Sequence, residues 1–224
     1  PLLKEKPLGR DFAEAHDLVG RARAAGCPLQ TAIQRRRHDS YDFLYRYLMS
    51  HQLTVHEVHA HLHLGKGNPP GSQVTSTGGW RSNRQNSGGG ILLDAGYHLI
   101  DLVMHLVGPF DVVSSTLISE GHLEIGQGIE ERAWVLGRNE HAWIMIDTWL
   151  RGNPSDSGPS AYQKSEGICL QTSGGVLYAN RSQVRLEQSV LCESDVAWKH
   201  AMQSQLYDFA NNILAHHWED LHFW

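Results

Sequence analysis

The fold of this chain is decided by residues 88–101, which read Gly-Gly-Gly-Ile-Leu-Leu-Asp-Ala-Gly-Tyr-His-Leu-Ile-Asp. A flexible glycine run leads into an apolar helix that carries Asp94, His98 and Asp101. The spacings of four and three residues place these three side chains on one stripe of the helix. The other residues are mostly apolar, which predicts a packed helix. Polar side chains on such a helix require an explanation.

Asp94 and His98 support two interpretations. In the first, His98 accepts a proton from an alcohol while Asp94 orients substrate hydroxyls, because imidazole titrates in the range that acid–base catalysis needs. In the second, His98 is a core residue bonded to a backbone carbonyl, and Asp94 is the N-cap of the helix. Spacing alone leaves both open.

The composition is that of an ordinary globular protein. The 224 residues are 41% hydrophobic and 19% charged, enough for one large domain or two small ones. A net charge of −5 gives no electrostatic case for nucleic acid or an anionic membrane as a partner. No apolar run approaches the ~20 residues that span a bilayer. The scattered Cys27, Cys169 and Cys192 indicate reduced thiols, so we expect a cytoplasmic protein.

The first 36 residues predict a short α/β unit of a parallel sheet. We expect a buried strand at 2–5, a turn at Pro7, a helix at 12–25 and a second strand at 29–34. Asp11 is the expected N-cap, and Gly26 ends the helix. Phe12 is expected on the packed face of this helix.

The remaining residues predict an α+β fold with a large, mainly antiparallel sheet. We expect helices at 39–50, 91–107 and 197–216, and strands at 54–64, 111–120, 129–138, 141–150, 167–172, 175–180 and 183–189. Asp39 or Ser40 is the expected cap of the first of these helices. Residues 65–90 predict a long polar loop. The last helix is expected to pack through Met202, Leu206, Phe209, Ile213 and Leu214.

Histidines recur on one side of the strand predicted at 54–64. His59, His61 and His63 alternate with apolar residues and therefore share a face. A pair such as His59 and His61 can chelate zinc, as in a metal-dependent hydrolase. The other interpretation is a solvated or interface face of a half-exposed sheet. No second cluster of Asp, His and Lys follows in the sequence, so we expect no metal.

Glu5-Lys6-Pro7 is a further candidate for chemistry. A lysine at a strand end, held by a proline turn, can project into the cleft where strand ends gather. A surface lysine with no such role is the other interpretation.

Together, these segments resemble one family. Glu5-Lys6-Pro7, followed by a helix of the form Glu-Ala-x-x-Leu-Val, is similar to a motif of the glucose-fructose oxidoreductase, inositol dehydrogenase and MocA family. So is Gly-Gly-Gly-x-Leu-x-Asp-x-Gly-x-His-x-x-Asp at 88–101. Lesser matches are Gln34-Arg35-Arg36, Gly174-Gly175-Val176-Leu177 and Leu206-Tyr207-Asp208-Phe209. The resemblance covers residues 2 to about 214.

The resemblance implies an architecture. The family has an N-terminal Rossmann domain that binds NAD or NADP, and a C-terminal open-faced mixed sheet with helices on one side. Residues 1–36 would then be a remnant of the dinucleotide-binding domain, and residues 37–224 the substrate-binding and oligomerisation domain. A homodimer or homotetramer would form through the open sheet face.

The resemblance also implies roles for individual residues. Lys6 would lie beside the nicotinamide, Asp94 would bind hydroxyls of a small polyhydroxy substrate, and His98 would be the general acid/base. Further contacts with the substrate are implied for Arg35, Tyr97 and Asp101. Glu5 and Pro7 would border the cofactor with Lys6.

The sequence departs from the family because it contains no Gly-x-Gly-x-x-Gly strand turn ahead of Lys6. We therefore expect a C-terminal part of a longer NAD(P)-dependent dehydrogenase, inactive by itself. The alternative is a catalytically inactive binding or dimerisation module.

Overall fold

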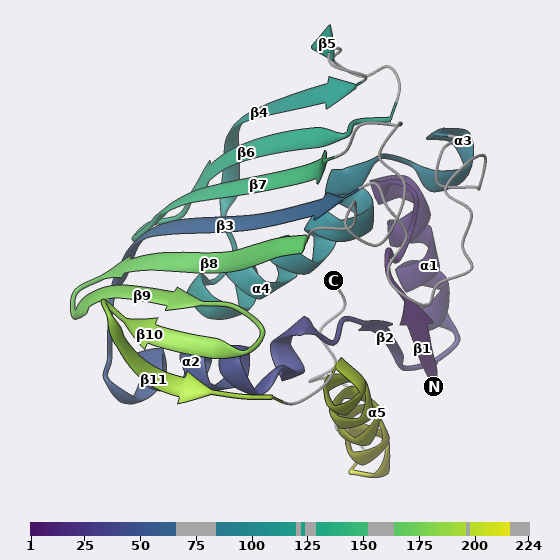
Figure 1. The fold of residues 1–224 in the computed structure, drawn as a ribbon. Helices are drawn as coiled ribbons and strands as arrows, with labels where there is room; N and C mark the ends of the chain where they lie inside the picture. The colour runs from purple at the N-terminus through teal and green to yellow at the C-terminus, as the bar shows by residue number, and fades with distance from the viewer. Residues whose placement is uncertain (66–83, 120–121, 124–128, 152–163, 196–197, 216–224) are drawn as a thin grey trace.

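Two parallel strands and one helix form the amino-terminal unit. The computed structural model describes residues 1–65, 84–119, 122–123, 129–151, 164–195 and 198–215. Strand β1 (Leu2–Glu5) pairs in parallel with β2 (Leu29–Ala32), and α1 (Phe12–Ala24) connects them. The Asp11 side chain accepts a hydrogen bond from the backbone N–H of Glu14 at 2.8 Å, as an N-cap does. The predicted α/β pattern is therefore confirmed, and Figure 1 shows the unit beside one end of the large sheet.

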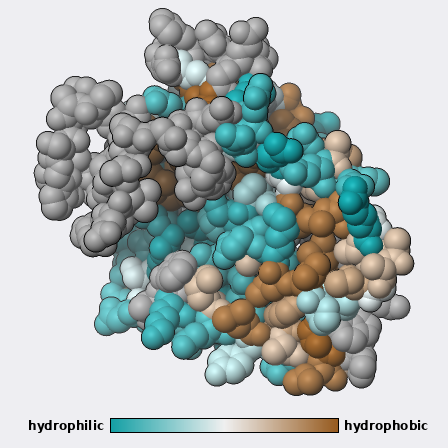
Figure 2. All heavy atoms as spheres, turned by 90° about the vertical axis from the view of Figure 1, so that its right-hand side faces the viewer, coloured by the Kyte–Doolittle hydropathy of each residue, from teal (hydrophilic) through white to brown (hydrophobic). Residues whose placement is uncertain are grey.

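Two details of that prediction are wrong. β1 is not buried, since Leu2 is 53% exposed, and Phe12 is 84% exposed instead of packed. For β1, the reason is that it pairs only with β2 among the described residues, so its other edge has no neighbour there. The face seen in Figure 2, on the side of α1 and β1, accordingly has hydrophobic areas beside hydrophilic ones.

A nine-stranded sheet forms most of the structure. Its order is β11-β10-β9-β8-β3-β7-β6-β4-β5. All neighbours are antiparallel except β3 and β7, so the sheet is mixed and mainly antiparallel, as predicted. The strands are β3 (Val55–Gly65), β4 (Asp111–Ser119), β5 (His122–Leu123), β6 (Arg132–Arg138), β7 (Trp143–Arg151), β8 (Lys164–Thr172), β9 (Gly175–Ala179), β10 (Gln183–Leu186) and β11 (Ser189–Glu193).

Helices cover one face of this sheet, and the core lies between them. α2 (Asp39–Ser50) and α4 (Tyr97–Val107) lie behind the strands in Figure 1. β3 turns Val58, Ala60 and Leu62 toward these helices with at most 2% exposure. Its histidines alternate onto the opposite face. The fold is thus α+β with helices on one side.

By length and composition alone, the helical stretch Arg84–Val107 could cross a membrane. Half of its apolar window is buried. Leu99, Leu102 and Val103 are at most 1% exposed and belong to the main core. It is therefore a core helix of this fold. It contains α3 (Arg84–Ser87), a π-helical turn (Leu92–Gly96) and α4.

Two other boundaries differ from the sequence prediction. The N-cap of α2 is His38, because Ser40 lies inside the helix and donates its hydroxyl to the Asn180 carbonyl at 2.6 Å. The strand predicted at 183–189 is split into β10 and β11 by a turn at Glu187, whose φ is 51°.

The terminal helix α5 (Trp198–Leu214) packs through a different face from the one predicted. Ala201 and Gln205 are buried, whereas Leu206 is 52% and Leu214 is 78% exposed. Most of the loop predicted at 65–90 lies outside the described residues.

Candidate functional site

Lys6 and Asp94 meet where the amino-terminal unit contacts the large domain, although 88 positions separate them in the chain. Lys6 follows the carboxyl end of β1, and the Lys6–Pro7 peptide bond is cis. Its Nζ donates to Oδ1 of Asp94 at 3.0 Å and also to the backbone carbonyl of Asp94. The Lys6 side chain is 17% exposed and that of Asp94 38%, so a small molecule can reach the pair.

Glu130 closes the amino end of the Asp94 helix. Its buried carboxylate accepts hydrogen bonds from the backbone N–H groups of Gly90, at 2.7 Å, and Leu92, at 3.0 Å. Glu130 therefore fills the capping role that the sequence would give to Asp94. That interpretation of Asp94 is wrong, and its carboxylate is directed instead to Lys6.

Glycines allow the close approach on which this arrangement depends. A Cβ at Gly90 would lie 2.0 Å from the backbone oxygen of Glu130, and one at Gly88 would lie 2.1 Å from that of Arg10. Gly88 also has a φ of 80°, which side chains rarely adopt. The glycine run therefore allows the start of the helix to contact the backbone at Arg10 and at Glu130.

A π-helical turn over Leu92–Gly96 carries Asp94. Such turns are rare and occur frequently at functional sites. A Cβ at Gly96 would lie 2.9 Å from the Thr148 side chain of β7, so glycine is needed for the turn to pack on the sheet. The sequence predicted a regular helix here, because a π turn has no periodic signal of its own.

His98 lies one turn beyond Asp94, in a buried and positively charged environment. Burial, followed by the charges of Arg35, Lys6 and Arg181, lowers the pKa of His98 to about 3. The imidazole is therefore neutral at pH 7. Its Nδ1 is buried and has no hydrogen-bond partner among the described residues.

Arg35 lies close by, at the carboxyl side of β2, in the 3-10 helix η1 (Arg35–Arg37). It is buried and pairs with Glu166 of β8 at 2.9 Å. Lys164 and Arg181 reach the same carboxylate at 2.6 and 2.5 Å. Burial would raise the pKa of Glu166, but the three cations together lower it to about 2. The carboxylate is therefore ionised over the whole neutral range.

Asp101, by contrast, forms a buried ion pair with Arg36. Both of its carboxylate oxygens accept from the guanidinium, Oδ2 from Nε at 2.7 Å. The side chain of Asp101 is 6% exposed, and its pair with Arg36 ties α4 to η1; the substrate contact implied for Asp101 stays a prediction. Tyr97 is partly buried, and burial raises the pKa of its hydroxyl.

Residues 54–154 match a known domain family, the GFO/IDH/MocA C-terminal domain. The chain is also 33% identical over 105 residues to a protein of Amycolatopsis mediterranei named as an oxidoreductase subunit of UDP-kanosamine synthase. That alignment covers 47% of this chain and 27% of the relative.

Solved structures of dehydrogenases share the fold. A levoglucosan dehydrogenase in complex with NADH and levoglucosan superposes with a TM-score of 0.74 at 15% identity, covering 94% of this chain and 64% of that one. D-galactose-1-dehydrogenase from Rhizobium etli gives 0.70 at 18%, covering 95% and 61%. The WlbA dehydrogenase from Bordetella pertussis, in complex with NADH and UDP-GlcNAcA, gives 0.66 at 16%, covering 95% and 60%. The chain thus spans about three fifths of these structures.

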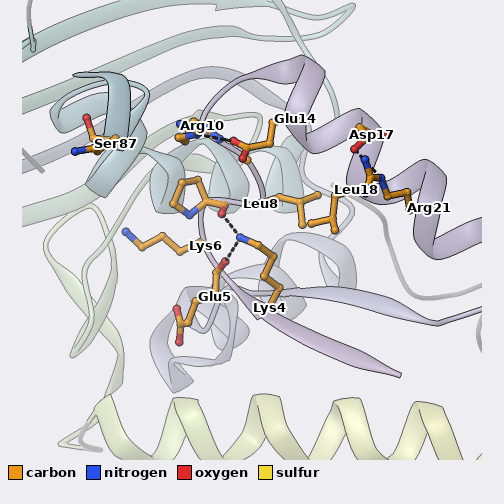
Figure 3. A pocket seen from close by; sticks show the side chains of 13 residues that line it. Lys4, Glu5, Lys6, Leu8, Arg10, Glu14, Asp17, Leu18, Arg21 and Ser87 are labelled. Atoms are coloured by element: carbon orange, nitrogen blue, oxygen red, sulfur yellow. Dashed lines mark hydrogen bonds and ion pairs between the residues drawn. The ribbon is translucent and has the colours of Figure 1, made fainter. Parts of the chain in front are cut away.

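The residues predicted to border a cofactor line one side of a pocket of ≈ 510 Å³. Figure 3 shows Lys4, Glu5 and Lys6 along β1 and the turn after it, with Lys4 on the side of α1 and the side chains of Glu5 and Lys6 directed away from it. Lys4 donates to the carbonyl oxygens of Glu5 and Pro7, and the Lys6 amine points away from these. Lys4 therefore holds the turn from which Lys6 extends.

Among the described residues, the histidines of β3 do not form a metal-binding cluster. His61 contacts the Ser165 hydroxyl at 3.0 Å, and His63 contacts Asp147 at 3.0 Å. No group of three His, Cys, Asp or Glu residues among those described is arranged to hold a metal ion. The geometry agrees with a half-exposed sheet face and gives no support to the zinc hydrolase hypothesis.

Sequence reasoning missed Glu130, Lys164, Glu166 and Arg181. All four lie in or next to strands, where single charges carry no local pattern. For Glu166 and Lys164, the strand alternation gave an indication. Both residues lie on the same face of β8 as the buried Ile168 and Leu170. Charges on a core face require partners.

Proposed function

We propose that this chain is the substrate-binding and catalytic part of an NAD(P)-dependent oxidoreductase that acts on a CH–OH group of a sugar or similar polyhydroxy molecule. The observation that supports this most is the contact between Lys6 and Asp94, next to a neutral and buried His98. A hydroxyl-bearing substrate at this place meets a cation, a carboxylate and an imidazole within one small region.

Each of these residues has a distinct task in the proposal. Lys6 donates a hydrogen bond to the reacting oxygen of the substrate. It stabilises the negative charge that develops on that oxygen as the hydroxyl proton leaves. Asp94 accepts hydrogen bonds from neighbouring hydroxyls and fixes the orientation of the ring. His98, neutral at pH 7, accepts the hydroxyl proton. Catalysis on these residues therefore consists of orienting the alcohol and removing its proton.

NAD or NADP supplies the hydride acceptor when bound. The residues present fit only the reacting end of such a cofactor. Glu5, Lys6 and Pro7 stand at the carboxyl end of a parallel strand, where ligands of α/β sheets bind. We assign residues 1–36 to a dinucleotide-binding domain and residues 37–224 to the substrate domain on the same grounds.

The open face of the sheet supports a homodimer or homotetramer. Trp143, Met145 and Leu136 lie there with 49, 41 and 38% exposure, and Arg132 stacks on Trp134 with 3.9 Å between its guanidinium carbon and the ring centroid. We place the protein in the cytoplasm. A catalytically inactive dimerisation module is the second candidate, because the same face suits self-association without any chemistry.

Dehydrogenase activity tests the proposal directly. NADH or NADPH formation is measured with a panel of sugars and polyols, in the longest natural polypeptide that contains this chain. His98→Ala is expected to lower kcat/KM by about 10²–10⁴-fold, the usual effect of losing a general base. Lys199→Met, at an exposed site on α5, is the control. Undiminished turnover by His98→Ala would remove the role given to His98, and no activity with any sugar would favour the inactive module.

A further inference from the structure

The cluster around Glu166 carries more positive charge than its one carboxylate can balance. Arg35, Lys164 and Arg181 each form an ion pair with Glu166. Within the part of the chain that the structure describes, no other carboxylate pairs with any of the three. Among the described residues, the cluster therefore carries three positive charges against one negative charge.

Hydrogen-bond donors are also in excess there. Two guanidinium groups and an ammonium carry about thirteen N–H donors, whereas a carboxylate offers about four lone-pair positions. Buried charge and unpaired donors are costly when nothing compensates them. A second anionic group with several oxygens would satisfy both deficits, since charge-assisted hydrogen bonds to arginine are the strong kind.

The cluster is built in two levels. Arg35 and Glu166 form its floor, with side chains 5 and 7% exposed. Lys164 at the start of β8 and Arg181 in the turn between β9 and β10 form its rim, with side chains 24 and 33% exposed. An incoming group can therefore reach the rim cations while the floor stays fixed.

The cluster lies beside the proposed catalytic residues. Arg36, the residue after Arg35, pairs with Asp101 of α4, the helix that carries His98. After burial, the charges of Arg35, Lys6 and Arg181 lower the pKa of His98, as expected for an imidazole near both the cluster and the Lys6–Asp94 pair. A substrate oriented by Lys6 and Asp94 would extend a substituent toward Lys164 and Arg181.

We propose that Lys164 and Arg181, supported by Arg35, bind an anionic carboxylate or phosphate group of the substrate. This inference rests on the proposed function for the place of the substrate. It implies a sugar acid or a phosphorylated sugar in preference to a neutral sugar. The bound anion would also offset the positive charge around His98 and raise the pKa of that imidazole toward the range in which it accepts protons efficiently.

Calorimetric titration of the 224-residue chain tests this. The probes are D-glucuronate, D-glucose 6-phosphate, D-glucose and inorganic phosphate, so that the carboxylate and phosphate sources are separated. We expect at least one anionic sugar to bind about tenfold or more tightly than D-glucose, which corresponds to about 1.4 kcal/mol. Lys164→Gln and Arg181→Gln should abolish that preference, and Lys164→Arg should retain it.

Arg46→Gln is the matched control, because it removes a positive charge from a side chain that is 69% exposed on α2. Circular dichroism establishes that each variant is folded. Should a rim variant not fold, Glu166→Gln gives a second readout. In the Glu166→Gln variant, the three cations of the cluster lose the carboxylate that pairs with them. Inorganic phosphate should therefore raise the Tm of this variant by more than it raises the Tm of the unaltered chain.

The outcomes separate the two proposals. Equal affinity for D-glucose and the anionic sugars, or a preference that survives Lys164→Gln and Arg181→Gln, overturns the anion site and leaves the proposed function standing. Phosphate binding that depends on Lys164 and Arg181, without binding of any sugar, supports the anion site and counts against the proposed function. Binding of none of the probes overturns the anion site.

Discussion

Glu130 shows how one carboxylate can organise a site from a distance. It accepts from two backbone N–H groups at the start of the Asp94 helix, so the helix begins where Glu130 holds it. Asp94 is thereby left to contact Lys6. The position of the candidate site depends on a residue that touches no proposed substrate atom.

Glu130→Ala should lower the free energy of unfolding by about 2–4 kcal/mol, because one buried and one half-buried N–H group lose their acceptor at about 1–3 kcal/mol each. Urea denaturation followed by circular dichroism measures this. Glu140→Gln, at an exposed position, should stay within about 0.5 kcal/mol of the unaltered chain. A Glu130 variant as stable as that control would mean that the cap is dispensable.

Gly90 offers a prediction with an internal comparison. Gly90→Ala brings a methyl group against the Glu130 backbone at 2.0 Å, so the helix start must shift, and we expect a loss of about 3 kcal/mol or more. Gly20→Ala lies within α1 with open space around the added Cβ, and should stabilise the chain by up to about 1 kcal/mol through helix propensity. Thermal unfolding of both variants checks the opposite signs.

At the scale of elements, η1 joins three separate parts of the fold. Its three arginines pair with different elements: Arg35 with Glu166 of β8, Arg36 with Asp101 of α4, and Arg37 with Asp208 of α5. Arg37 and Asp208 are 2.7 Å apart. One helical turn thereby holds the sheet, the Asp94 helix and the terminal helix around the candidate site.

The Arg36–Asp101 pair should be strongly coupled. Asp101→Asn or Arg36→Met alone should cost about 3–5 kcal/mol, because each leaves a buried charge without its partner. The double variant should cost less than the sum of the two. A double-mutant cycle from urea denaturation measures the coupling. The exposed Arg21–Asp17 pair on α1 should give only about 0.3–0.5 kcal/mol in the same experiment.

At the scale of the whole molecule, buried histidines should set the acid stability. Burial, then the charges of Arg181 and Arg35, lowers the pKa of His38 to about 4, and burial with neighbouring cations lowers that of His98 to about 3. Between pH 6.5 and these values the unfolded chain binds more protons, so stability is present above pH 6.5 and is lost as the pH falls.

Each histidine should therefore cost about 2 kcal/mol between pH 6.5 and 5. Tm measured across that range should fall, and His38→Gln should make the dependence shallower without touching Lys6 or Asp94. His141→Gln, an exposed position, is the control. A pH profile that His38→Gln leaves unchanged would show that this imidazole does not titrate as its burial indicates.

Much of the architecture could be predicted, and the failures have a common origin. The alternation in β3 and the apolar periodicity of α4 are local patterns, so the bounds of β3 were predicted nearly correctly and the end of α4 at Val107 was predicted correctly. Phe12 and Leu206 were placed inside because helical periodicity identifies an apolar face without showing what lies against it. The π turn at Asp94 had no pattern at all.

By itself, the sequence determined most of the elements, their order and the candidates Lys6, Asp94 and His98. The spacing of residues along a helix and the glycines and prolines that end helices and strands are properties of the chain alone. Only the tertiary structure decided which charges meet. Arg36 and Asp101 lie 65 positions apart, and the local sequence around each residue does not indicate its partner in the ion pair. Long-range ion pairs depend on how layers pack, and for that reason the cationic cluster beside His98 emerged only from the folded chain.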